Sequence, residues 1–100
     1  MATAGTATLS TSPSTLHSAS ATGDPAVSEV LFFNTSATVG IMVQVAPLHA
    51  AGDWLTLPPT PAAAAPIPVR LRCRGNQIRS ILAKAAGAGS PVLNWSVSEI

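Results

Sequence analysis

Hydrophobic and polar positions alternate with a period of two in several short segments, and this alternation predicts β-strands with one buried face. The clearest case is residues 38–46, where branched side chains occupy every second position: Val39, Ile41, Val43 and Val45. Residues 92–100 show the same pattern, with Leu93, Trp95 and Val97 on one face. We therefore expect both segments to be strands that contribute to a common core.

The run AVSEVLFF at residues 26–33 is short, apolar and rich in branched and aromatic side chains, which is typical of a buried strand. It ends at Asn34, a residue that favours turns. The linking segment NTSAT, residues 34–38, has the length and chemistry of a hairpin turn. This predicts that strands 26–33 and 38–46 are antiparallel neighbours.

A further alternation begins near Ile67, where Val69, Leu71 and Cys73 are separated by arginines and followed by a Gly75–Asn76 turn. The next segment, Gln77–Ala86, fits two structures. Its apolar residues stand at helical spacing, but the preceding strand and turn favour a strand that pairs as a hairpin partner. The core candidates of this segment are Ile78 and Leu82.

Two segments lack a clear strand pattern. Residues 2–22 are rich in Thr and Ser and are interpreted as an extended arm or an edge strand, with residues 1–12 as a flexible arm and 13–100 as a single domain. Residues 47–68 hold six of the nine prolines, so we expect them to cross the surface without regular structure. The alanine run at 62–65 is too short to favour a helix.

These elements add up to six to eight short strands separated by turns. The spacing predicts an all-β fold, an antiparallel β-sandwich of immunoglobulin-like or jelly-roll-like form with an extended N-terminal arm.

The composition is unusually poor in charged residues. Only 9% of the 100 residues are charged and the net charge is +1, against about a quarter charged in typical soluble domains. Low charge weakens the repulsion between copies, so we expect assembly with copies of the chain or with a partner protein. No apolar run is long enough to span a bilayer, and the amino terminus lacks the basic start and apolar stretch of a secretory signal, which predicts synthesis in a cytoplasm.

Groups that could perform catalysis are scattered along the chain. No carboxylate pair shares a strand face, and no glycine-rich phosphate loop joins a strand to a helix. An enzyme would need Cys73 to meet His17 or His49, whereas Cys73 fits a small core residue beside Val69 and Leu71. We therefore predict no enzymatic activity, no cofactor and no metal, because isolated histidines cannot supply the three or four ligands of a zinc site.

All five basic residues lie within residues 70–84, and Arg70, Arg72 and Arg74 would project from one face of a strand. This row is interpreted either as a solvated, edge-guarding row or as an interface for a partner protein. Nucleic acid is not an expected partner, because no aromatic residues are interleaved with the basic ones. Trp54, in a Gly-Asp-Trp-Leu loop, is the candidate exposed anchor.

Residues 13–99 resemble a small β-sandwich protein that recurs among the structural proteins of tailed bacteriophages. The resemblance lies in the order of SPSTLHSA, VLFFNTSAT, the alternating strand VGIMVQVAP, a variable loop, and the late segments LRCRGNQIRSILA and VLNWSVSEI. Asn76 stands where members usually carry an acid after the glycine.

The resemblance implies a structural virion component of the head, neck or tail, made in the host bacterial cytoplasm and incorporated into the virion. It would pack against copies of itself and against a capsid, neck or tail protein, without a membrane, and no catalytic residue is implied. The alternative is a glycan- or receptor-binding tip module in which Trp54 and Asp53 form the sugar platform.

Overall fold

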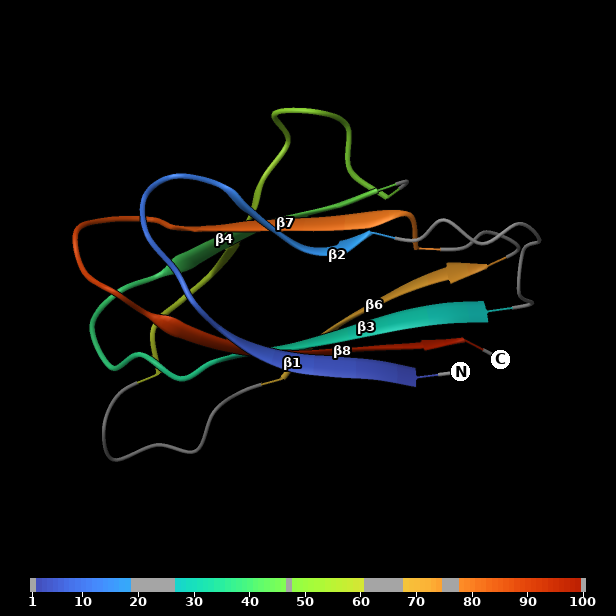
Figure 1. Ribbon diagram of the computed structural model, residues 1–100, viewed down its shortest axis with the longest axis horizontal. Coiled ribbons are helices and arrows are strands. Elements are labelled where there is room, and N and C mark those ends of the chain that lie inside the picture. The colour runs from blue at the N-terminus through green and yellow to red at the C-terminus, as the bar shows by residue number, and fades with distance from the viewer. Residues whose placement is uncertain (1, 19–26, 47, 61–67, 75–77, 100) are drawn as a thin grey trace.

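The computed structural model describes residues 2–18, 27–46, 48–60, 68–74 and 78–99 of the chain (Figure 1). Every regular element in these ranges is a β-strand. The eight strands are β1 (Ala2–Thr8), β2 (Ser14–Ser18), β3 (Val27–Asn34), β4 (Ile41–Ala46), β5 (Leu55–Leu57), β6 (Val69–Arg74), β7 (Ser80–Ala85) and β8 (Val92–Glu99). No helix in the described ranges could cross a membrane.

The alternation along the sequence corresponds to burial in the structure. In β4, Ile41, Val43 and Val45 are fully buried while the residues between them are partly exposed. In β8, Leu93, Trp95 and Val97 are buried, while Asn94 and Ser96 between them are exposed or partly exposed. These predictions are confirmed, because alternate side chains of a strand point to opposite faces of its sheet.

The strands form two four-stranded sheets that face each other as two layers (Figure 1). The first sheet has the order β1-β8-β3-β6 and the second has the order β2-β7-β4-β5. All the pairings are antiparallel. The predicted all-β, antiparallel sandwich is therefore confirmed.

The pairing follows a simple rule that defines the type of sandwich. The first strand pairs with the eighth, the second with the seventh, the third with the sixth and the fourth with the fifth, as in one long hairpin. Two further pairings, β3 with β8 and β4 with β7, wrap this hairpin around itself. An eight-stranded double sheet built in this way is a jelly roll, the second of the two forms that the sequence left open.

The predicted hairpin between residues 26–33 and 38–46 is wrong. Both segments are strands, but β3 lies in the first sheet and β4 in the second, so the chain crosses between layers at residues 35–40. Asn34 explains the difference because its side chain is buried. Its amide nitrogen lies 3.0 Å from Val39 O, 3.2 Å from Leu57 O and 3.1 Å from Pro58 O, and its Oδ1 accepts a hydrogen bond from Ser36 N at 2.9 Å.

The segment that follows Gly75 and Asn76 in the sequence contains a strand, as favoured over a helix, but its expected partner is wrong. β7 pairs with β4 and β2 in the second sheet, whereas β6 pairs with β3 in the first. Residues 75–77 lie outside the described ranges. Ile78 is buried as expected, whereas Leu82 lies on the outer face and is only partly buried. The core position of this strand is Ile81, one residue earlier.

The described part of the proline-rich region, residues 48–60 and 68, contains one short strand that the sequence did not predict. Leu55–Leu57 forms β5, the edge of the second sheet, and Leu57 is buried against the core. Prolines at 58 and 59 follow directly and lack the amide donor that a longer strand would need. Residues 61–67, which include the alanine run, lie outside the described ranges.

For the N-terminal segment, the structure contains the edge strand rather than an arm apart from the domain. β1 pairs with β8 from Ala2 to Thr8. Beyond it Leu9 is buried, its amide donates to Pro91 O at 2.9 Å, and Ser10 O accepts from Ala85 N at 2.7 Å. Residues on both sides of position 12, where the arm was expected to end, therefore contact the sandwich in the structure.

We predict that Asn34→Asp destabilises the fold by about 3 kcal/mol or more, because a carboxylate cannot donate to the carbonyl groups that surround the native amide. Asn94→Asp is the matched control. Asn94 is exposed on β8 and accepts from the Thr6 hydroxyl at 3.1 Å, a role that a carboxylate keeps, so its effect should stay within about 0.5 kcal/mol. Urea unfolding of both variants measures the difference, and equal losses would show that Asn34 does not tie the layers.

We also predict that Gly5→Val destabilises the fold by about 1–3 kcal/mol through overpacking. A Cβ on Gly5 would lie 3.0 Å from the Trp95 ring, so the indole would have to move. Ala4→Val, one residue earlier and exposed, should cost little because that side chain points away from the core. Thermal unfolding of the two variants compares the positions, and a Gly5 variant as stable as the wild type would contradict the packing of β1 on Trp95.

Candidate functional site

The predicted arginine row lies on the outer face of the first sheet. β6 is the edge strand of that sheet, and its exposed residues Arg70, Arg72 and Arg74 alternate with inward-facing ones. Cys73 is buried in the core and Val69 and Leu71 pack against that core, as expected. The row therefore projects from the sandwich as its sequence predicted.

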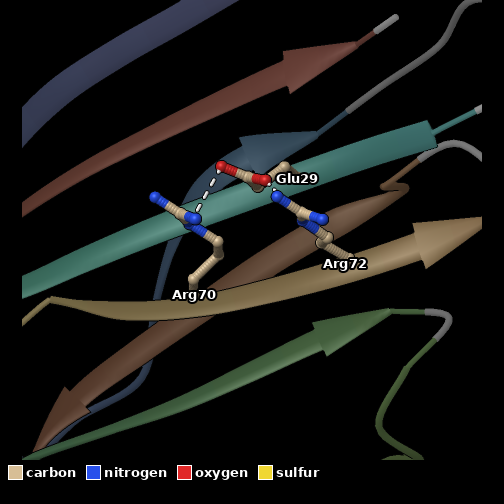
Figure 2. Close-up of polar contacts among 3 residues, drawn as sticks. All are labelled: Glu29, Arg70 and Arg72. Atoms are coloured by element: carbon tan, nitrogen blue, oxygen red, sulfur yellow. Dashed lines mark hydrogen bonds and ion pairs between the residues drawn. The ribbon is translucent and has the colours of Figure 1, made fainter.

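Glu29 of the neighbouring strand β3 joins two of these arginines (Figure 2). Its Oε1 lies 3.2 Å from Arg70 Nε, and its Oε2 lies 2.7 Å from Arg72 Nε. The register explains the contact. Glu29 pairs directly with Arg72, and Arg70 lies two residues before Arg72 on the same face of β6. Glu29 was not predicted as part of the row, because only the pairing of β3 with β6 brings this acid to it.

The ion pairs leave the face positively charged. Both arginine side chains are more than half exposed, at 55% and 57%, and exposed pairs of this kind contribute about 0.2–1 kcal/mol each to stability. One carboxylate stands against three guanidinium groups on this strand pair. Figure 2 shows Glu29 between the two arginines, with one carboxylate oxygen directed to each Nε.

Apolar side chains lie beside the charges. Leu31 and Phe33 share the outward face of β3 with Glu29, and both are partly exposed. On the far side of β3, β8 presents Asn94, Ser96 and Ser98. The outer face of the first sheet thus changes from small polar groups to an apolar pair and then to arginines. Interfaces between proteins are enriched in arginine and aromatic residues in this way.

Trp54, the fourth predicted interface residue, does not join the arginines. It is partly buried next to β5, and the Lys84 ammonium lies 4.5 Å from the centre of its ring. Lys84 projects from β7 between buried Ala83 and Ala85, so it stands on the outer face of the second sheet. The arginine row and Trp54 therefore lie on opposite faces of the sandwich.

The two histidines that were considered as partners for Cys73 in an enzyme contact other parts of the fold. His49 Nδ1 accepts a hydrogen bond from Val45 N at 3.1 Å, which closes the turn after β4. The His17 ring packs against the Trp95 ring, with 6.1 Å between centroids. Within the described ranges, histidine, cysteine and acidic side chains form no group that could hold a metal ion.

Comparison of the chain with protein-family models, with curated proteins and with solved structures finds no significant match.

We predict that Cys73 reacts slowly with a thiol reagent such as DTNB in the folded protein and rapidly in urea, because the residue is 6% exposed. The ratio of the two rates measures its burial. Equal rates would contradict its place in the core, and a folded-state rate above that of free cysteine would revive a nucleophilic role.

Proposed function

We propose that the chain is a structural subunit of a tailed-bacteriophage virion, which packs against copies of itself and against a capsid, neck or tail protein. The observation that carries the proposal is the jelly-roll pairing of its eight strands. Viral capsid domains are built on this fold, and so are lectins and cupins. Because this fold serves several functions, the choice of a virion subunit over a lectin or an enzyme also needs support from the surface of the molecule.

The described surface suits contact with other proteins. The outer face of the first sheet places Leu31 and Phe33 between small polar side chains and exposed arginines. With 9% charged residues in the whole chain, few charges would have to lose their water when two such surfaces meet. On a symmetric particle, many weak contacts add up through effective concentration.

The virion setting is supported by the order of sequence segments described above, from SPSTLHSA through VLFFNTSAT to VLNWSVSEI. In the structure these segments include strands of both sheets and much of the core. The residues that carry the resemblance are therefore residues that build the sandwich, which is what a shared fold requires.

The glycan-binding alternative depends on Trp54 as a stacking platform for a sugar ring. One face of this ring lies under the Lys84 ammonium, and the side chain is only partly exposed. A sugar would have to displace the cation or use the opposite face. This arrangement favours a structural role for Trp54 in holding the β4–β5 connection against β7.

Mass spectrometry of gradient-purified virus particles from cells that produce this chain tests the proposal. We expect the chain to sediment with the particles and to be present in many copies per particle, because a structural subunit repeats with the symmetry of the particle. Recovery of the chain only in the soluble fraction, with none on particles, would overturn the virion assignment. A parallel assay with glycan arrays would detect the alternative function.

A further inference from the structure

The connection between β4 and β5 is a fixed turn. Asp53 N donates to Ala50 O at 3.0 Å, and Gly52 has φ +82°, which together define a type II turn over residues 50–53. Gly52 N also donates to Gln44 Oε1 at 2.9 Å, which ties the turn to β4. The backbone of this connection is therefore held by hydrogen bonds at several points.

This turn presents an apolar side chain and an acid to solvent. Leu48 is 38% exposed, and it is the most exposed large hydrophobic side chain in the described ranges. Asp53 is exposed at the end of the turn. Figure 1 shows the connection rising from the second sheet on the side away from the first sheet. We call residues 48–53 the acidic turn.

The opposite face of the molecule carries the complementary pattern. There Leu31 and Phe33 lie beside Arg70 and Arg72, with Glu29 holding both arginines through Nε. We call these five residues the arginine strip. It combines apolar surface with an excess of positive charge, whereas the acidic turn combines an apolar side chain with a negative charge.

We infer that the acidic turn of one copy docks on the arginine strip of a second copy, an inference that rests on the proposed function of a self-assembling subunit. The Asp53 carboxylate would accept hydrogen bonds from the guanidinium of Arg70 or Arg72, because these side chains are 55% and 57% exposed and share a single carboxylate, Glu29. Leu48 would cover part of Leu31 and Phe33. Charge and apolar surface are thus matched in the same contact.

The position of the two surfaces determines the kind of assembly. They lie on opposite faces of the sandwich, so a bound copy still presents its own unoccupied strip or turn. Such a head-to-tail contact builds a ring if its rotation closes, and an open array if it does not. A two-fold dimer would instead bury the same surface from both copies.

Charge reversal tests this contact in the full chain. We expect D53K and R70E/R72E each to weaken self-association about tenfold or more in sedimentation velocity, because each one places like charges across the contact. An equal mixture of the two variants should associate again. In the mixture, every turn can find a strip of opposite charge, either as in the wild type or with both signs exchanged.

Matched variants separate this contact from general charge effects. T11E/S12E lowers the net charge by two, as R70Q/R72Q does, but at exposed residues between β1 and β2 that belong to neither surface, so it should associate nearly as the wild type does. Circular dichroism melting checks that each variant is folded. If R70E/R72E alone unfolds, the neutral pair R70Q/R72Q and D53N replaces the reversals, and each should weaken association on its own.

The outcomes distinguish the inference from the proposed function. Self-association that is unaffected by D53K and R70E/R72E would overturn this contact but leave a structural subunit in place. Wild-type chain that stays monomeric at every concentration would overturn the contact between copies, while its presence on purified particles would keep the proposed function. Loss in both single variants without rescue in the mixture would show that each site contacts some other surface of the second copy, and would also overturn the contact between turn and strip.

Discussion

The pairing of β3 with β8 holds the first sheet of the jelly roll together. β1 pairs with β8, and β3 pairs with β6. The contact between β3 and β8 joins these two strand pairs into one four-stranded sheet. In this pairing Val30 and Phe32 stand opposite Val97 and Trp95, and all four side chains are buried. Without it, the hairpin would be a ribbon that could not cover its apolar face.

Wrapping the hairpin also determines what the surface offers. It places β6 with its arginines at one edge of the first sheet and carries the β4–β5 connection to the outer side of the second. Two surfaces far apart on one molecule can meet only between molecules. The chain has few charges and partly exposed apolar side chains. With two such surfaces on opposite faces, these properties favour contact between copies of the chain.

Local elements could be predicted from the sequence because side-chain alternation reflects burial directly. The strand at 41–46 and the inward face of Leu93, Trp95 and Val97 follow from a period of two. The strand at 80–85 was favoured over a helix because a strand and a turn precede it, although its apolar residues stand at helical spacing. Leu82 was given the wrong face, because Ile81 and Leu82 are adjacent and equally apolar.

Strand partners and the contacts between them could not be predicted. The segment after Asn34 has the composition of a hairpin turn, and nothing in the composition shows that the Asn34 amide is buried against carbonyls of residues 39, 57 and 58. The arginine row was identified, but Glu29 is separated from it by more than forty residues in the chain. Trp54 was expected as an exposed anchor, and only the pairing of β7 with β4 places Lys84 over its ring.

An isotope-filtered NOE experiment on a mixture of labelled and unlabelled chain detects only contacts between copies and therefore tests the head-to-tail contact itself. We expect signals between Leu48 methyl groups of one copy and the Phe33 ring of another. Signals that join Leu48 to Leu48, or Phe33 to Phe33, would contradict it, since they would show a two-fold contact in place of the head-to-tail one.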